Sequence, residues 1–206
     1  MSRLKTTLIK APEDTRRRIL KAAFDEFYAT GFQGGSLNDI VDKAGTTKGA
    51  LFHHFQGKYD LACAVIEEVV QPMIKEHWLD PLACSIDPIQ DLKSLLREFA
   101  KNVLQNRRLE YGCPLNNLAQ EMSPLDENLR SRIDKVYSMW REALAAALAR
   151  GIKAGTVRVG ISPGKVAAFV VAAQAGIMGT AKAAQSQELM SQAGAGLVDY
   201  LNSLKP

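Results

Sequence analysis

The stretch "GTTKGALFHHFQGK" (Gly45–Lys58) decides how the N-terminal part of the chain folds. It opens with a glycine, which adopts the left-handed backbone of a tight turn at little cost. Small polar residues and a lysine follow, and then the apolar residues Leu51 and Phe55. Because residues four positions apart share one face of a helix, the stretch predicts a turn leading into a short helix with one buried and one polar face.

Two further helices are expected before this turn. Residues 14–30 carry apolar side chains at helical spacing, and Gly31 follows as a helix-ending residue. Ser36 is expected to open the second helix, because Asp39 three residues later completes a capping-box pattern. Val41 before the turn and Leu51 after it are placed to pack together. Two helices joined in this way form a helix-turn-helix over residues 36–55.

The polar face of the third helix carries short and basic groups. The residues left outside the core are Thr46, Thr47, Lys48, Gly49, His53 and His54. A helix that enters the major groove of DNA needs such groups near its N-terminal end, where they reach base edges. Lys58 is placed to meet a backbone phosphate. Residues 1–60 hold 10 Lys/Arg against 7 Asp/Glu, whereas residues 61–206 hold 16 against 15, so the basic excess lies at the same end. We therefore predict double-stranded DNA as a partner.

The adjacent histidines allow two other interpretations. A metal site is disfavoured because neighbouring helix positions do not face each other, and metal-binding pairs on helices prefer i, i+4 spacing. A pair of surface histidines without function stays open. We predict no metal and no cofactor.

The run "TRRRILKAAFDEFYATGFQGGSLNDIVDKAGTTKGALFHHFQGKYDLACAVIE" (Thr15–Glu67) resembles the DNA-binding region of TetR-family transcriptional regulators. The shared motifs are TRxxILxAA, a GF after the first helix, SxxDI, AGx(T/S)KGALFHHF and a following lysine. The resemblance implies an obligate homodimer that places one recognition helix per subunit on an inverted-repeat operator. It assigns DNA contacts to Ser36, Thr46, Thr47, Lys48, Gly49, His53, His54 and Lys58. Many members have a phosphate-contacting tyrosine where this chain has Phe52, which we expect to pack instead.

The rest of the chain also predicts helices, so the expected fold is all-α with about nine of them. The remaining ranges are 58–78 (interrupted by Pro72), 89–106, 114–122, 126–153, 163–184 and 187–204. We divide the chain into a DNA-binding domain, residues 1–57 with a basic N-terminal arm, and a ligand-binding and dimerisation domain, residues 58–206. Residues 1–12 are expected to be disordered, and whether they contact DNA stays open.

The last two predicted helices suit a dimer interface. Residues 163–184 are apolar on most faces, so burial on most sides is expected. Four small residues would allow close helix approach: Ala172, Ala175, Gly176 and Gly179. We predict a homodimer through 163–184 and 187–204; the alternative is plain core of a monomer.

The resemblance also implies a small-molecule effector bound by the second domain. Candidate ligand-binding residues are His77, Trp78, Phe99, Cys113, Asn117, Glu121, Met122, Tyr137, Trp140, Phe169 and Met178. Aromatic and methionine residues at such spacing are more often plain core. Cys113 directly precedes Pro114 in "YGCPLNNLAQEMS" (Tyr111–Ser123), a run similar to a GCPLxNLAxE pattern of one branch of the family. A helix N-terminus lowers a thiol pKa, so we weigh an electrophile or redox sensor against an inert thiol.

The sequence therefore predicts a ligand-responsive transcriptional regulator, a repressor that a small molecule or electrophile releases from DNA. The alternative is an architectural DNA-binding protein without ligand control. An enzyme with Cys113 as nucleophile is disfavoured, because two of the three histidines lie on the recognition helix. The chain shows no export signal, and its longest uncharged stretch, residues 166–181, is short for a membrane span. We expect a cytoplasmic protein with free thiols. The effector, the operator and the choice between repressor and activator are not encoded in these patterns.

Overall fold

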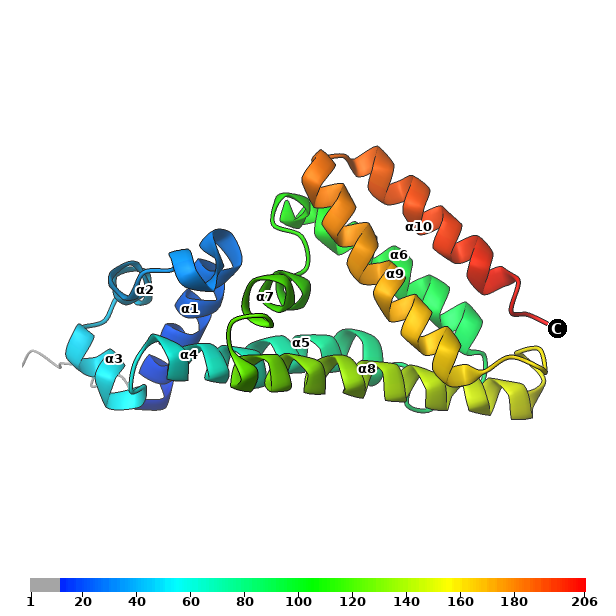
Figure 1. The fold of residues 1–206 in the computed structure, drawn as a ribbon, viewed down its shortest axis with the longest axis horizontal. Helices are drawn as coiled ribbons and strands as arrows, with labels where there is room; N and C mark the ends of the chain where they lie inside the picture. Colours follow the sequence, from blue (N-terminus) through cyan, green and yellow to red (C-terminus); the bar gives the residue numbers. More distant parts are fainter. Residues whose placement is uncertain (1–11) are drawn as a thin grey trace, which may run out of the picture. The chain divides into compact units, whose positions relative to one another are not determined.

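The computed structural model describes residues 12–206, and the predictions made for residues 1–11 lie outside this range. The chain divides into two compact units, one up to Val65 and one from Ile66 onward (Figure 1). Over the described range every regular element is a helix, as the sequence predicts.

From residue 12 onward the N-terminal unit has four helices, of which the first contacts the other three. They are α1 (Pro12–Gly34), α2 (Leu37–Ala44), α3 (Lys48–His54) and α4 (Lys58–Val65). The core side chains Ile19, Ile40, Leu51 and Leu61 are at most 1% exposed, so each helix places at least one residue at the centre. The predicted domain boundary after residue 57 differs from the observed division after Val65, because α4 packs against α1 and belongs to the N-terminal unit.

Local backbone chemistry sets the ends of these helices. Gly31 breaks the helical geometry of α1 with φ 80° and ψ 166°. Ser36 caps α2 by accepting a hydrogen bond from the Asp39 N–H at 3.4 Å, and Gly45 ends α2 in the left-handed region at φ 58°. Thr47 caps α3 in the same way, accepting from the Ala50 N–H at 3.1 Å. The predicted turn between the second and third helices is therefore present, with Gly45 in the conformation that favours glycine.

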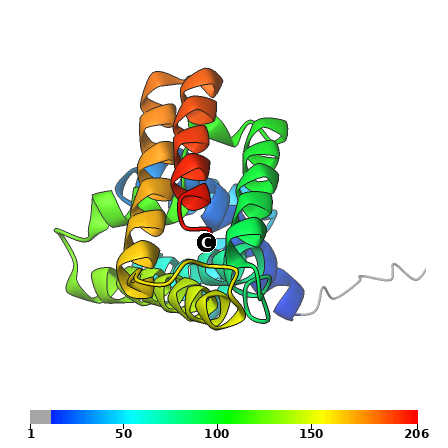
Figure 2. The same cartoon turned by 90° about the vertical axis from the view of Figure 1, so that its right-hand side faces the viewer.

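The C-terminal unit is built around the long helix α8 (Glu127–Ala154). Its other elements are η1 (Ile66–Val70), α5 (Gln71–Ile74), η2 (Lys75–Leu79), α6 (Pro88–Gln105), η3 (Arg108–Glu110), α7 (Pro114–Met122), α9 (Pro163–Ala184) and α10 (Gln187–Asn202). Helix α9 packs against α8, and α10 returns antiparallel beside it and also contacts α6 (Figure 2). The apolar stripe predicted on α8 is buried from Leu129 to Leu148.

The predicted helix 58–78 is divided into α4, η1, α5 and η2. Two of these segments, η1 and η2, are π-helical, and Pro72 lies in the first turn of α5 between them. Proline has no N–H to donate to the preceding turn, so the usual α-helical bond is missing there. Wider turns on both sides of Pro72 accommodate that loss, since π-helical insertions shift the bonding pattern by one residue.

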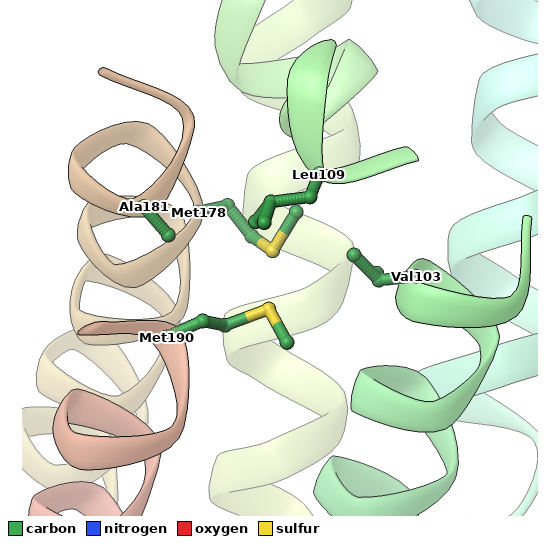
Figure 3. Packing of buried hydrophobic residues seen from close by; sticks show 5 residues of the cluster. All are labelled: Val103, Leu109, Met178, Ala181 and Met190. Atoms are coloured by element: carbon green, nitrogen blue, oxygen red, sulfur yellow. The ribbon is translucent and has the colours of Figure 1, made fainter. Parts of the chain in front are cut away.

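The far end of the C-terminal unit holds a small methionine-rich core. Val103 of α6, Leu109 of η3, Met178 and Ala181 of α9, and Met190 of α10 pack together (Figure 3). Phe99, Ala100, Cys113 and Ile177 lie against this core and are partly buried. The predicted ligand-binding residues Met178 and Cys113 therefore share one apolar environment.

Helix α9 is the one described helix long and apolar enough to cross a membrane by length and composition. The core helix of a soluble protein passes the same test. Its inner face packs on α8 and α10, while Ala168, Ala172 and Gly176 are exposed, so the expected burial on most sides is not met within one subunit.

Candidate functional site

The polar face predicted for the third helix lies on the surface of the N-terminal unit. Thr47, Lys48, Gly49 and His53 are exposed, while Thr46 and His54 are partly buried. Leu51 and Phe55, on the opposite face, are 1% and 2% exposed. Helix α3 therefore presents a polar N-terminal end and is anchored through its apolar face, the arrangement that a major-groove helix requires.

Thr47 combines a structural and a potential binding role. Its hydroxyl oxygen accepts the cap hydrogen bond from Ala50, so the hydroxyl hydrogen remains available for donation to a phosphate or a base. A side chain added at Gly49 would meet no atom closer than 3.8 Å in this chain, so glycine there is not required by local packing. Glycine at this exposed position leaves the backbone of α3 open to close approach by a partner.

Two α1 side chains fix the helix-turn-helix, and the sequence analysis missed both. The Arg18 guanidinium donates to the carbonyl oxygens of Ala44 and Gly45 and so holds the turn. Glu26 is 3% exposed; its carboxylate accepts from the Ser36 N–H at 3.2 Å and pairs with the Lys43 ammonium. The hydrogen bond from Lys43 chiefly holds the pKa of Glu26 below its usual value. In the sequence, Glu26 lies seven residues after Ile19, on the apolar face of α1. A carboxylate at such a position is the pattern that could have identified this residue as functional.

Lys58, expected at a phosphate, also serves within its own unit. Its ammonium donates to the Gln33 carbonyl oxygen at 2.9 Å and lies 5.0 Å from the centre of the Phe32 ring. These contacts tie α4 to the end of α1. An ammonium has three hydrogens, so the contact to Gln33 leaves donors for a phosphate.

The two histidines of α3 contact each other, contrary to the expectation that adjacent positions do not face. The His53 and His54 ring centroids lie 5.1 Å apart, edge to face. Partial burial, with smaller contributions from His53 and Arg16, lowers the pKa of His54. His54 is therefore uncharged at neutral pH and offers a hydrogen-bonding ring. Over residues 12–206 no group of three or more metal-binding side chains comes together.

Phe52 is exposed, so the prediction that it packs was wrong. Its side chain is 53% exposed on the same short helix as the expected DNA contacts. Helix α3 spans only seven residues, and Leu51 already occupies the position that faces the core. Phe52 belongs to the outer surface of the recognition helix.

Four of the predicted ligand-binding residues form one aromatic cluster in the C-terminal unit. His77 and Trp78 come from η2, Phe99 from α6 and Trp140 from α8. The Trp78 ring stacks on Trp140 with centroids 5.0 Å apart, and Phe99 lies 5.4 Å from Trp78 and 5.5 Å from His77. Phe99 also packs against the methionine-rich core, so the cluster and Met178 lie in one continuous apolar region.

The remaining candidates are distributed around this region. Met122 is 5% exposed and buried in the core. Burial chiefly raises the pKa of the partly buried Tyr137, with a smaller effect from Cys113 nearby. Glu121 is partly buried. Asn117 donates to the Tyr111 carbonyl oxygen at 2.6 Å and accepts from the Lys182 ammonium at 3.3 Å, so its amide fastens the segment before α7 to α9.

Phe169, another predicted ligand-binding residue, lies on the surface and outside the aromatic cluster. Its side chain is 51% exposed on α9 and meets Tyr200 of α10 edge to face, with centroids 4.7 Å apart. Because nearly every face of α9 is apolar, its sequence pattern does not reveal which face turns inward. Phe169 lies on the outer face of the α9–α10 pair.

The environment of Cys113 opposes the predicted thiolate. Burial raises the pKa of this thiol, and the N–H groups of Leu115 and Asn116 at the start of α7 oppose that effect without reversing it. Cys113 packs against the methionine-rich core, where few groups stabilise a negative charge. The three cysteines, all within the described range, form no disulfide.

An all-α chain with an N-terminal helix-turn-helix and a larger helical unit defines a class of DNA-binding regulators. Residues 19–65 match the model for bacterial regulatory proteins of the tetR family, and residues 88–197 match the model for the tetracyclin repressor-like C-terminal domain. The chain belongs to the TetR family of transcriptional regulators.

Individual relatives agree with this membership. An uncharacterised HTH-type transcriptional regulator of Lactococcus lactis subsp. lactis is 32% identical over 132 residues, which cover 64% of this chain and 67% of the relative. A TetR transcriptional regulator from Chloroflexus aurantiacus has the same fold, with a TM-score of 0.82 and 24% identity over 94% of this chain and 97% of that one. SmeT in complex with triclosan gives a TM-score of 0.74 and 23% identity, covering 92% and 90% of the two chains. Members of this family bind DNA through the helix-turn-helix and carry a ligand-binding domain, a class distinct from enzymes.

Proposed function

We propose that this protein is a cytoplasmic, homodimeric repressor that a small molecule releases from an inverted-repeat operator. The observation that carries the proposal is the α3 surface, where Thr47, Lys48 and Gly49 stand exposed at the helix N-terminus. On DNA, Thr47 and Gly49 lie against base edges in the major groove, and Lys48 reaches a guanine acceptor or a phosphate. Ser36, Thr46, His53, His54 and Lys58 contact bases or phosphates around them.

The outer surface of α9 and α10 supports dimerisation through these two helices. Ala168, Ala172 and Gly176 form an exposed row on α9 at four-residue spacing. A Cβ atom added at Gly176, Gly194 or Gly196 would meet no atom of the chain within 4 Å, so packing within one subunit does not require glycine there. Glycine inside a helix costs about 1 kcal/mol relative to alanine. Close approach by the same helices of a second subunit explains its use, with a four-helix interface as the result.

In the dimer, two α3 helices enter successive major grooves about 34–36 Å apart. The effector binds the C-terminal unit and favours a state of the dimer in which that spacing is lost. Its effect on DNA affinity is limited to its differential affinity for the two states. SmeT, a family member of the same fold, is known in complex with triclosan, which supports a small organic effector.

The direct test is selection of bound fragments from a random DNA pool at physiological salt, followed by sequencing. We expect an inverted repeat whose half-sites are one helical turn apart. Recovery of fragments without a shared motif would contradict the proposal and favour an architectural DNA-binding protein. The recovered operator then serves as the probe for release by candidate effectors.

A further inference from the structure

One atom of the aromatic cluster has no partner. The Nε2 atom of His77 is shielded from solvent and makes no hydrogen bond. It lies among rings: the His77 centroid is 4.6 Å from that of Trp78 and 5.5 Å from that of Phe99. Most buried polar atoms in folded proteins are paired, and leaving one unpaired costs about 1–3 kcal/mol. The position therefore requires an explanation.

The unpaired atom is an acceptor. Burial chiefly lowers the pKa of His77, while Glu98, the Leu95 carbonyl and Glu76 raise it by smaller amounts. The ring is therefore uncharged at neutral pH, with one N–H and one lone pair. Nε2 makes no hydrogen bond, whereas the Leu95 backbone acts on the ring, so we assign the ring hydrogen to Nδ1 and the lone pair to Nε2. Its missing partner is a hydrogen-bond donor.

A trapped water fits this position poorly. A buried water is typically held by two to four polar partners. Among the described residues of Ile66–Pro206, Nε2 is the one buried side-chain nitrogen or oxygen atom that lacks a hydrogen bond. The rings of Trp78 and Phe99 are its neighbours. A molecule that stacks on these rings and brings a single donor matches the surroundings better.

The charge of that molecule is restricted as well. Ser85 and Gln174 are the polar side chains below 9% exposure in the described part of the C-terminal unit, so no carboxylate is fully buried there. An ammonium ligand would lose its hydration without gaining a buried counter-ion, which is costly. An uncharged ligand avoids this penalty.

One side of the cluster is less deeply buried than the other. His77 and Phe99 are partly buried, whereas Trp78 and Trp140 are 3% and 4% exposed. Phe99 rests on the methionine-rich core, in which the Met178 and Met190 side chains point into the space between α6, α9 and α10 (Figure 3). Methionine side chains are flexible and readily repack around an incoming apolar group.

We infer that the cluster of His77, Trp78 and Phe99 binds a flat, uncharged aromatic molecule with one O–H or N–H group, whose hydrogen is donated to His77 Nε2. This inference rests on the proposed ligand control and names the chemistry of the effector. The rings supply stacking and burial of apolar area, and His77 selects for the donor. An analogue that lacks the donor leaves Nε2 unpaired and binds less tightly.

The test compares 2-naphthol with its methyl ether 2-methoxynaphthalene, which keeps the rings and the oxygen but carries a methyl group in place of the donated hydrogen. Isothermal titration calorimetry of the full-length protein should show 2-naphthol binding at least about tenfold more tightly, equivalent to ~1.4 kcal/mol. His77→Phe keeps a ring but removes the acceptor, so the preference should disappear. Phe99→Leu, the matched control, should weaken both probes and keep their ratio.

Three results would overturn the inference: equal affinity of the two probes for the wild type, no binding of either, or an undiminished preference in His77→Phe. If His77→Phe unfolds, as judged by circular dichroism, the comparison on the wild-type protein decides alone.

Operator binding is measured in parallel by gel shift. Specific DNA binding without discrimination between the probes removes this inference and leaves the regulator intact. Discrimination without any specific DNA site supports the inference and contradicts the proposed function.

Discussion

At the scale of single residues, the charge state of each group on α3 determines how it contributes to DNA binding. Lys48 is an exposed ammonium at the first position of the helix, whereas burial lowers the pKa of His54 and leaves that ring uncharged at neutral pH. Affinity that comes from neutralised phosphates falls with salt concentration, by a slope of about 0.9 per contact. Affinity that comes from a hydrogen bond to an uncharged group does not fall with salt concentration in this way.

Lys48→Ala is therefore expected to reduce the slope of log K against log salt by about 0.9 if Lys48 meets a phosphate. His54→Gln is expected to weaken binding at pH 7.5 without changing this slope. The measurement is fluorescence anisotropy with the selected operator over a salt series, with Lys153→Ala on α8 as a surface control. A reduced slope in His54→Gln would show that the ring is charged on DNA.

The buried Glu26 makes the N-terminal unit sensitive to acid. Its folded-state pKa lies below the usual value of 4.5, chiefly because of the hydrogen bond from Lys43. A carboxyl group with a depressed folded pKa stabilises the fold above its unfolded pKa, and this stabilisation disappears as the pH falls through the folded value. Glu26→Gln should lower the free energy of unfolding by about 1–2 kcal/mol at pH 7, and the difference from wild type should shrink below pH 4.5.

Urea unfolding of the full chain at a series of pH values measures this difference. Asp25→Asn is the control, because Asp25 pairs with Lys21 on the surface and such pairs contribute little. A difference between wild type and Glu26→Gln that persists unchanged at low pH would show that the charge of Glu26 is not what stabilises the unit.

The three cysteines should differ in reactivity. Cys84 is exposed, Cys63 is buried, and burial raises the pKa of Cys113. Because the thiolate is the reactive form, Ellman's reagent should label one thiol quickly in the native protein at pH 7.5. That fast phase should vanish in Cys84→Ser and remain in Cys113→Ser. Loss of the fast phase in Cys113→Ser would restore the sensor hypothesis.

At the scale of the helices, boundaries that depend on local chemistry were predictable. Gly31, Ser36 and Gly45 interrupt or limit helices through their own backbone or side chain, and the predicted range 114–122 coincides with α7. The contacts of Glu26 that stabilise the helix-turn-helix were not predictable, because its partners Ser36 and Lys43 lie ten and 17 residues further along the chain. Such pairings depend on how α1 and α2 cross.

The orientation of helices without a clear polar face was equally hard to predict. Phe52 was expected to pack but is exposed, and the exposure of Phe169 was not anticipated. The stripe on α8, repeated over several turns, was placed correctly. Helix α3 is too short and α9 too uniformly apolar for periodicity to identify the inner face. The ring contacts that join His77, Trp78 and Phe99 come from two separate elements and follow from tertiary packing alone.

The close packing of the C-terminal end of α8 against its neighbours can be tested by substitution of Gly151. A Cβ atom there would lie 2.5 Å from Val157 Cγ2 and 2.8 Å from Pro88 Cδ. Gly151→Ala improves helix propensity, yet overpacking should dominate and destabilise the protein by about 1–3 kcal/mol. Gly164→Ala is the control, since nothing lies within 4 Å of its added Cβ. Thermal unfolding compares the two variants; equal melting temperatures would mean that α8 and its neighbours shift to make room.

At the scale of the whole molecule, the proposed dimer determines whether the α3 surface suffices for operator binding. One seven-residue helix contacts a single half-site, so high affinity depends on two linked half-sites. The α9–α10 surface, with its exposed row of small residues, is where we place the contact between subunits. A bulky charge in this row would be buried without a partner in a dimer, while in a monomer it would remain in water.

Ala172→Arg should therefore yield a folded monomer whose operator affinity falls about 100-fold or more, because the gain from binding two half-sites at once is lost. Ala146→Arg adds the same charge to an exposed position on α8 and should leave both assembly and affinity unchanged. Sedimentation velocity reports the mass, and circular dichroism checks the fold of each variant. A dimer that persists in Ala172→Arg would move the interface away from this row. A monomer that still binds the operator tightly would instead show that DNA recognition does not require the dimer.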